Sequence, residues 1–179
     1  VGVAGATVTG SVDPLGATSD LAARAGVWFH VDAAWGGGML LSPSLRGALA
    51  GIERADSVVL DAHKQFYVPV GLSSLLLRDP RAAAAIQYEA GYMLRDGSED
   101  LGRWSVEGSR PWASLLLYAA MHLLGWSGYA ALAEQAMARA RLMAELVRAR
   151  RSFELVLEPQ TPQVVYRLSP PGGGAALAD

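Results

Sequence analysis

Cysteine is absent from this chain, and its absence removes several classes of function. Without cysteine the 179 residues can form no disulfide bond, no thiolate nucleophile and no cysteine-bound zinc site. The three histidines are scattered along the sequence, which does not favour a compact metal cluster. A chain without cysteine suits a reducing compartment, so we expect a cytoplasmic protein with no bound metal.

The chain also has no excess of charge of one sign and no long hydrophobic run. The 15 basic and 17 acidic residues leave a formal net charge of −2, which gives no electrostatic footprint for DNA, RNA or an anionic membrane surface. The apolar run of residues 113–124 is too short for a hydrocarbon core of about 30 Å and contains His122. We therefore expect neither nucleic acid nor membrane as a partner.

The composition that remains is that of a folded domain. Apolar residues make up 51% and charged residues 18% of the chain, as in soluble globular proteins. The length is sufficient for one domain with a hydrophobic core. Because the chain opens at Val1 without a methionine and enters an apolar stretch at once, we expect a fragment that begins inside a strand.

Short apolar runs bounded by Gly, Pro and Asp alternate with helical patterns in the first half, which predicts an α/β fold with a mostly parallel sheet. Residues 19–25 are predicted to form a crossover helix, with Ser19 as its N-cap and Gly26 after its end. Further helices are predicted at 111–124 and from about 127 to 150. The predicted strands are 1–7, 27–31, 57–60, 72–77, 153–157 and 164–168.

Lys64 is the only lysine among the 15 basic residues, in a chain that uses arginine everywhere else. Arginine stays protonated up to a pH of about 12, so it cannot supply the neutral amine that forms a Schiff base with an aldehyde. A surface lysine kept by chance is the alternative. Against it, Lys64 follows an apolar strand in the sequence Asp61-Ala-His63-Lys64, and open parallel α/β sheets bind ligands at the carboxyl ends of their strands.

Asp32 also follows an apolar strand, and small residues come directly after it in Asp32-Ala-Ala-Trp-Gly-Gly-Gly38. A strand-end carboxylate beside residues that let a flat ring approach the backbone suits a cofactor whose protonated ring nitrogen needs a counter-charge. Taken alone, Asp32 is explained at least as well by a turn or a helix cap. Its pairing with the strand-end Lys64 favours the cofactor interpretation.

Thr7 is predicted to end a third strand, and its hydroxyl could bond the substituents of such a ring. The surrounding Gly5-Ala-Thr-Val-Thr-Gly-Ser-Val-Asp-Pro14 is also what an ordinary loop between a strand and a helix contains. The Asp13-Pro14 pair is predicted to start a turn.

Three segments of the chain carry a resemblance to a known family. They are Trp28-Phe-His-Val-Asp-Ala-Ala-Trp-Gly-Gly37, Arg54-Ala-Asp-Ser-Val-Val-Leu-Asp-Ala-His-Lys-Gln65 and Glu107-Gly-Ser-Arg-Pro111. Together they resemble the group II pyridoxal-phosphate-dependent amino-acid decarboxylases, which include glutamate, aspartate, aromatic amino-acid and tyrosine decarboxylases. The stretch His63-Lys-Gln-Phe-Tyr-Val-Pro69 is most similar to the bacterial branch of aspartate 1-decarboxylases and glutamate or tyrosine decarboxylases.

The resemblance implies a fold type I transferase-like large domain and pyridoxal 5'-phosphate as cofactor. By it, Asp32 pairs with the pyridinium nitrogen and Lys64 forms the Schiff base with the cofactor. Ala34 then packs against the ring, and Thr7 lies near the ring substituents. His63 is implied to lie beside the cofactor and to help hold its phosphate.

Further roles follow from the same resemblance. Asp61 is counted with the cofactor-binding residues. Arg110 matches an arginine of the family's Ser-Arg-Pro motif, where it either binds the substrate carboxylate or forms a structural ion pair. His30 precedes Asp32 by two residues, and either supports the cofactor site from behind or is a buried histidine bonded to backbone. Active sites of this fold type lie at a dimer interface, which implies a homodimer for the full-length protein.

The resemblance also divides the chain. Residues 1–108 correspond to the C-terminal half of a cofactor-binding large domain, 109–150 to a helical connection and 151–179 to the start of a small C-terminal domain. The family's ring-stacking residue and most of its phosphate loop would lie upstream, so we expect this chain alone to bind cofactor poorly. Many relatives protonate the product carbon from a loop tyrosine, and the loop 95–105 holds Trp104 but no tyrosine.

The implied reaction is α-decarboxylation of an L-amino acid to an amine and carbon dioxide, with aspartate or glutamate favoured and tyrosine next. Transamination and carbon–sulfur cleavage stay open, because they share the same lysine and aspartate on the same fold. A non-catalytic interaction fragment and a plain globular domain are the alternatives from other classes. The presence of both Lys64 and Asp32 argues against these two.

Overall fold

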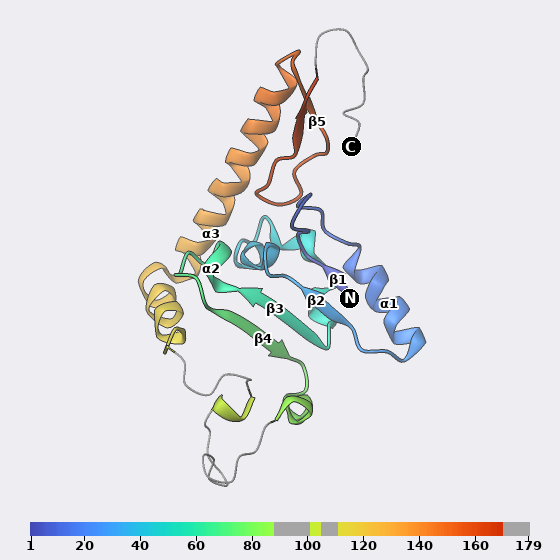
Figure 1. Cartoon of the computed structure of the whole chain (residues 1–179), viewed down its shortest axis with the longest axis vertical. Helices are drawn as coiled ribbons and strands as arrows, with labels where there is room; N and C mark the ends of the chain where they lie inside the picture. The colour runs from blue at the N-terminus through green and yellow to red at the C-terminus, as the bar shows by residue number, and fades with distance from the viewer. Residues whose placement is uncertain (88–100, 105–110, 170–179) are drawn as a thin grey trace.

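A four-stranded sheet forms the centre of the molecule (Figure 1). The computed structural model describes residues 1–87, 101–104 and 111–169. The strands are β1 (Gly2–Val3), β2 (His30–Asp32), β3 (Ser57–Asp61) and β4 (Ser73–Leu77), in that order across the sheet. β1, β2 and β3 are parallel and β4 is antiparallel to β3. The predicted α/β fold with a mostly parallel sheet is confirmed.

β1 is shorter than predicted, and Thr7 lies outside it. The strand ends at Val3 because Gly5, at φ 102°, turns the chain, and Ala4 makes an isolated bridge to Val12. A φ in this range is readily adopted by glycine alone. The prediction that a strand reaches Thr7 is therefore wrong, and Thr7 lies in the loop between β1 and α1.

Helix α1 (Leu15–Ala25) begins four residues before the predicted start, 19 minus 15. Pro14 occupies its N-cap position, and the buried Leu15 anchors the first turn in the core, so Ser19 lies inside the helix with its side chain buried. Tertiary packing of this kind outweighs the weak local signal of a capping serine. The predicted C-terminal end is confirmed, since Gly26 is left-handed at φ 62°.

Short helical turns link the strands of the first sheet. After β2 come three 3₁₀ turns, η1 (Gly36–Leu41), η2 (Arg46–Leu49) and η3 (Ile52–Arg54), and β3 runs directly into α2 (Ala62–Gln65). After β4 come η4 (Pro80–Ile86) and η5 (Leu101–Trp104). Val31, Ala33, Met39 and Leu49 form the fully buried centre of the main core.

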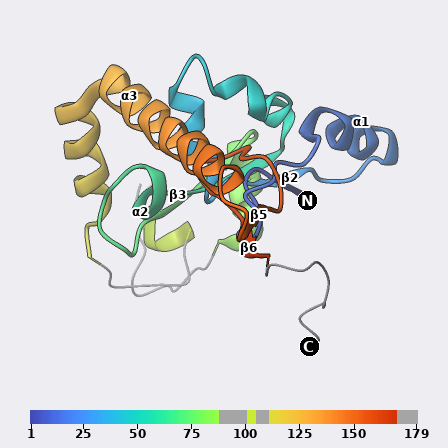
Figure 2. The ribbon, with the colours of Figure 1, turned by 90° about the horizontal axis from the view of Figure 1, so that it is seen from above.

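Helix α3 (Ser114–Arg148) is two helices joined at Gly125, whose φ of 63° and ψ of 179° are not helical. Figures 1 and 2 show its two parts running in clearly different directions. By length and composition α3 is apolar enough to cross a membrane. The break at Gly125 leaves 11 residues in the first part (114–124), about 16 Å of helix against a hydrocarbon core of about 30 Å.

A second sheet of two antiparallel strands, β5 (Phe153–Leu155) and β6 (Tyr166–Leu168), follows α3. It packs beside the end of α3, and Phe153 contacts Tyr166 across the pair with ring centroids 5.8 Å apart. The connection between the two strands returns toward the first sheet (Figure 1). Both predicted strands therefore exist, each shorter than its apolar run.

Candidate functional site

The carboxyl ends of β1, β2 and β3 meet at one edge of the sheet. Val3 pairs with Asp32, and Asp32 pairs with Val59, two residues before Asp61. Because the three strands are parallel, the segments that follow them lie at the same edge. The topology thus places Asp32 and the Asp61-Ala-His63-Lys64 turn side by side in the sheet order, as the sequence predicted.

Lys64 lies in α2, and hydrogen bonds hold the backbone of this turn both before and after it. Ala62 and Phe66 are buried, Ala62 N–H donates to the Leu72 carbonyl at 3.0 Å, and the buried Tyr129 hydroxyl donates to the Phe66 carbonyl at 2.9 Å. Burial raises the pKa of Tyr129, so this hydroxyl stays a donor at neutral pH. The backbone that carries Lys64 is therefore held by Leu72, just before β4, and by Tyr129 of α3.

The Lys64 ammonium is bound by Asp61, with Nζ 2.9 Å from Oδ2. The other carboxylate oxygen of Asp61 accepts the Ser73 hydroxyl at 2.5 Å. Burial raises the pKa of Asp61, but the hydrogen bonds from Ser73 and Lys64 lower it further, and the net pKa is below its ordinary value. Asp61 is thus an anion that fixes the position of the Lys64 amine.

His63 is oriented by contacts with Leu72 and Asp61. Its Nδ1 lies 3.2 Å from the Leu72 carbonyl, which can only accept, so Nδ1 carries a proton and donates. Its Nε2 lies 3.7 Å from the Asp61 carboxylate. One nitrogen of the imidazole is therefore hydrogen-bonded to the backbone, and the other faces the Asp61 carboxylate.

Asp32 ends β2 and is half-buried. Its Oδ1 accepts the Ala34 N–H at 3.0 Å, which is the turn geometry that a lone strand-end aspartate predicts. Among the described residues its Oδ2 has no hydrogen-bond donor. One oxygen thus shapes the turn, and the second is left to face a cationic group.

The glycines after Asp32 do different work from that predicted. A Cβ on Gly36 would lie 2.3 Å from the Ala4 carbonyl oxygen, one on Gly37 would lie 2.2 Å from the Leu60 side chain, and one on Gly38 would lie 2.5 Å from Gln65. The space beside all three is filled by protein atoms. The absence of side chains at these positions lets η1 pack against the ends of β1, β3 and α2.

A pocket of about 180 Å³ adjoins Lys64. Trp35, Gln65 and Tyr67 line it together with Ala133, Ala136 and Pro162. Both polar atoms of the Gln65 amide are buried without a hydrogen-bond partner, and Tyr67 is the sole non-glycine residue with positive φ, at 57°, in the described part of the chain. Strained and unsatisfied groups of this kind gather at functional sites.

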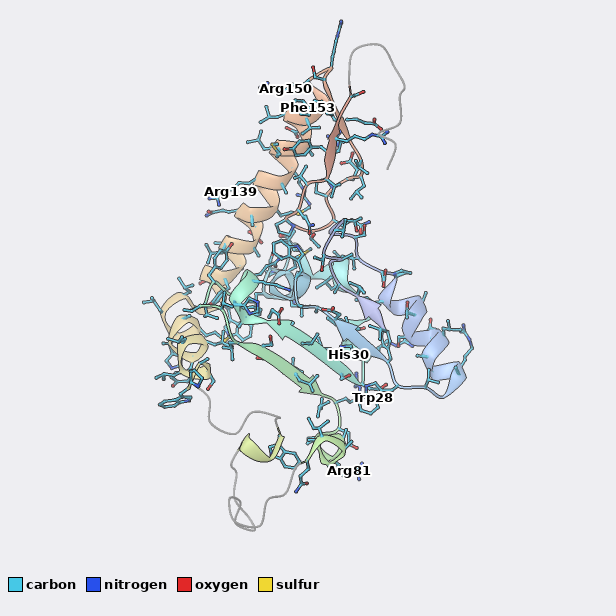
Figure 3. The ribbon with its side chains drawn as sticks, in the orientation of Figure 1. Trp28, His30, Arg81, Arg139, Arg150 and Phe153 are labelled. Atoms are coloured by element: carbon cyan, nitrogen blue, oxygen red, sulfur yellow. The ribbon has the colours of Figure 1, made fainter. Side chains whose placement is uncertain are left out.

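The remaining predicted residues fall in different places. Thr7 is exposed in the loop after β1, and Ala34 lies in the turn that Asp32 forms. Arg110 lies outside the described residues. His30 bonds the Ser57 hydroxyl at 2.7 Å, not backbone, and Figure 3 shows it with Trp28 at the end of β2 away from α2.

Comparisons with known proteins match nearly the whole chain. A model of the pyridoxal-dependent decarboxylase conserved domain matches residues 1–169. The chain belongs to the pyridoxal-dependent decarboxylase family. Aspartate 1-decarboxylase of Aliivibrio fischeri is 47% identical over 99% of this chain and 32% of its own, and mouse cysteine sulfinic acid decarboxylase is 38% identical over 93% and 35%.

Solved structures show the same fold. Mouse CSAD in its apo form has a TM-score of 0.86 at 38% identity, covering 95% of this chain and 36% of its own. Oryza sativa TDC with PLP and tryptamine has a TM-score of 0.88 at 30% identity, covering 99% and 37%. The chain therefore has the decarboxylase fold and spans about a third of the length of these relatives.

The residues present fit the cofactor of the decarboxylase family. The donor set at the edge of the sheet is one primary amine, held at 2.9 Å by a carboxylate, and one strand-end carboxylate with an oxygen that no described residue bonds. An amine of this kind can hold an aldehyde, and the carboxylate can face a protonated ring nitrogen. Lys64 and Asp32 are the residues that would hold pyridoxal phosphate here.

Sequence reasoning missed several residues around this site. Ser73 lies opposite Asp61 in the β3–β4 register, and only an antiparallel pairing of these strands reveals it. Thr161 reaches Trp35 from 126 residues away. No local pattern signals either contact. For Ser73, the sequence shows only a polar residue at the second position of the predicted strand 72–77.

Proposed function

We propose that this chain carries the cofactor-binding edge of an enzyme that removes the α-carboxylate of an L-amino acid with pyridoxal 5'-phosphate. The observation that carries the proposal is the placement of the Lys64–Asp61 pair and Asp32 at the carboxyl ends of neighbouring parallel strands. Membership of the decarboxylase family supports it. Transamination and carbon–sulfur cleavage have no observation in their favour.

Each side chain has a role set by its contacts. When bound, pyridoxal phosphate supplies a sink for the electron pair left by the departing carboxylate. Lys64 holds the cofactor through its amine, and Asp32 keeps the ring nitrogen protonated, which matters most as negative charge develops. Asp61 fixes the position of the Lys64 amine. His63, the residue before Lys64, would help to hold the phosphate of the cofactor. Once released, Lys64 in its ammonium form, or a neighbouring group, would return a proton to the product carbon.

A small acidic amino acid is the substrate we favour. The bacterial relative is an aspartate 1-decarboxylase, and the mouse relative acts on cysteine sulfinic acid. Aspartate and cysteine sulfinate both carry an anionic group on the β-carbon, so they share the chemistry that a cationic side-chain site selects. Aspartate comes first, glutamate next and tyrosine after them. Cytoplasmic location and a homodimeric assembly are part of the same proposal.

The experiment is an absorbance spectrum of the intact protein with added pyridoxal phosphate, before and after borohydride, beside Lys64→Ala and Arg81→Ala. Arg81 is a matched control, since it is a basic residue on the surface paired with Asp79. Wild type and Arg81→Ala should show a visible band that borohydride fixes covalently to the peptide of Lys64, and Lys64→Ala should show free cofactor. Carbon dioxide release from aspartate then tests the substrate. Equal spectra for wild type and Lys64→Ala would refute the proposal.

A further inference from the structure

The connection between β5 and β6 reaches back to the loop after β1. Gln160 Oε1 accepts the Val12 N–H at 2.7 Å, and Gln163 Nε2 donates to the Thr7 carbonyl at 2.7 Å. Between them, Thr161 binds Gly10. Residues 160–163, which we call the clamp, thus bond the β1–α1 loop at three points about 150 residues away in sequence.

Thr161 is the centre of the clamp and is completely buried. Its hydroxyl donates to the Gly10 carbonyl at 3.0 Å and accepts the Trp35 indole N–H at 3.2 Å. One small group therefore satisfies a backbone acceptor and a side-chain donor on two separate loops. Removing it leaves both without a partner, which is costly in a buried place.

The loop itself is shaped for this contact. A Cβ on Gly10 would lie 2.6 Å from Thr161 Oγ1, and one on Gly5 would lie 2.9 Å from Trp35 and 3.3 Å from the Thr161 methyl group. Both glycines have positive φ. The absence of side chains at these two positions is what allows Thr161 and Trp35 to meet against the loop.

The two loops that the clamp holds follow β1 and β2, at the edge of the sheet where the cofactor is proposed to bind. Thr7, proposed to lie near the ring substituents, is bonded through its carbonyl by Gln163. Trp35, bonded by Thr161, directly follows Ala34, which is proposed to pack against the ring. Trp35 and the clamp residue Pro162 also line the pocket beside Lys64.

We propose that Thr161 and Gln163 are positioning residues, which hold the Thr7 loop and the Ala34–Trp35 turn in the geometry that binds the cofactor. The segment between β5 and β6 then contributes to the cofactor site indirectly, by holding the loops that would contact the cofactor. This proposal rests on the proposed function for its effect on cofactor binding, whereas its effect on loop order does not depend on any ligand.

The first test uses Thr161→Val in the intact protein, because valine keeps the shape and removes the hydroxyl. Hydrogen exchange of the amides in residues 5–12 should become about tenfold faster and the dissociation constant for pyridoxal phosphate about tenfold higher, the effect of one buried hydrogen bond. Amides of α1 should not change. Thr161→Ser, which restores the hydroxyl, should return both values to within about twofold of wild type.

Thr18→Val is the matched control, since the Thr18 hydroxyl donates to the Pro14 carbonyl on the exposed side of α1. It should alter neither exchange in residues 5–12 nor cofactor binding. Gln163→Met, which removes only the bond to Thr7, guards against a Thr161 variant that does not fold. We expect it to weaken cofactor binding about threefold, while Gln135→Met on the exposed face of α3 has no effect.

The outcomes separate this proposal from the proposed function. Exchange that speeds up in Thr161→Val and recovers in Thr161→Ser, with weaker cofactor binding, supports the clamp. Unchanged exchange in residues 5–12 overturns it, as does faster exchange with cofactor affinity equal to wild type. If wild type itself binds no pyridoxal phosphate, the proposed function fails, whereas faster exchange in Thr161→Val that recovers in Thr161→Ser still shows that the clamp orders the Thr7 loop.

Discussion

The two carboxylate oxygens of Asp32 have different surroundings. Oδ1 accepts the Ala34 N–H and shapes the turn, and Oδ2 is bonded to none of the described residues. An asparagine side chain keeps one oxygen for the Ala34 N–H but carries no charge for a ring nitrogen. The substitution Asp32→Asn therefore separates the structural part of this residue from its electrostatic part.

We expect Asp32→Asn to lower kcat by about 10²–10³, as for the loss of one preorganised electrostatic contact. Borohydride should still trap the cofactor on Lys64, because the amine is untouched. Asp56→Asn is the matched control, since Asp56 accepts the Phe29 N–H at 2.7 Å near the other end of β2. A kcat that falls equally in both variants would mean that Asp32 acts through folding alone.

Asp61 makes the stability of the site depend on pH. Burial raises the pKa of Asp61, and the bonds from Ser73 and Lys64 lower it by more, so the folded protein has a lower pKa than the unfolded chain. The carboxylate therefore contributes stability that is fully present above the ordinary aspartate pKa. That stability is lost as pH falls through the lowered pKa of the folded state.

Urea unfolding of wild type and Asp61→Asn as a function of pH checks this prediction. The difference in unfolding free energy should be constant near neutral pH and should vanish in acid, below the folded pKa of Asp61. In Ser73→Ala one of the bonds that lower this pKa is gone, so the loss should begin at higher pH. A difference that persists undiminished in strong acid would contradict the linkage.

At the scale of an element, η1 depends on close contact between backbones. Gly36 donates its N–H to the Ala4 carbonyl at 2.9 Å, and an added Cβ would lie 2.3 Å from the same oxygen. Backbone cannot move aside as a flexible side chain can. The packing of η1 on the end of β1, and with it the position of the Asp32 turn, is thus set by the lack of a side chain at Gly36.

Gly36→Ala should lower the unfolding free energy by about 2–3 kcal/mol through overpacking. Gly47→Ala in η2 is its control, because no atom lies within 4 Å of a Cβ there. It should be neutral or stabilising by up to about 1 kcal/mol. Chemical denaturation of the two variants measures the difference. Equal stabilities would show that η1 can shift to accept the methyl group.

Local pattern was enough to predict the elements whose cause is local. The break in α3 follows from Gly125, the end of α1 follows from Gly26, and the positions of Lys64 and Asp32 follow from the apolar strands before them. The start of α1 and the end of β1 depend on contacts with other segments, and they were predicted wrongly. Ser73 and Thr161 were missed for the same reason, because register and the path of the β5–β6 connection bring them to the site.

At the scale of the whole molecule, several large apolar side chains are exposed on the first part of α3 and beside its break. Leu123 is 85% exposed and Trp126 is 69% exposed, and Trp112 just before the helix is exposed as well. Soluble proteins rarely leave several large apolar side chains of one element in water without a partner. The curated relatives are about three times as long as this chain, so they contain further chain that can cover such a face.

We expect these 179 residues, expressed alone, to bind anilinonaphthalene sulfonate and to self-associate, because the hydrophobic effect favours covering this face. Leu123→Glu combined with Trp126→Gln should reduce both dye fluorescence and the mass measured by light scattering. Val8→Glu is the control, since Val8 is 78% exposed and lies in the loop between β1 and α1, outside α3. A monomer that binds no dye, or a Val8 variant that changes as much, would show that the exposed part of α3 does not drive association.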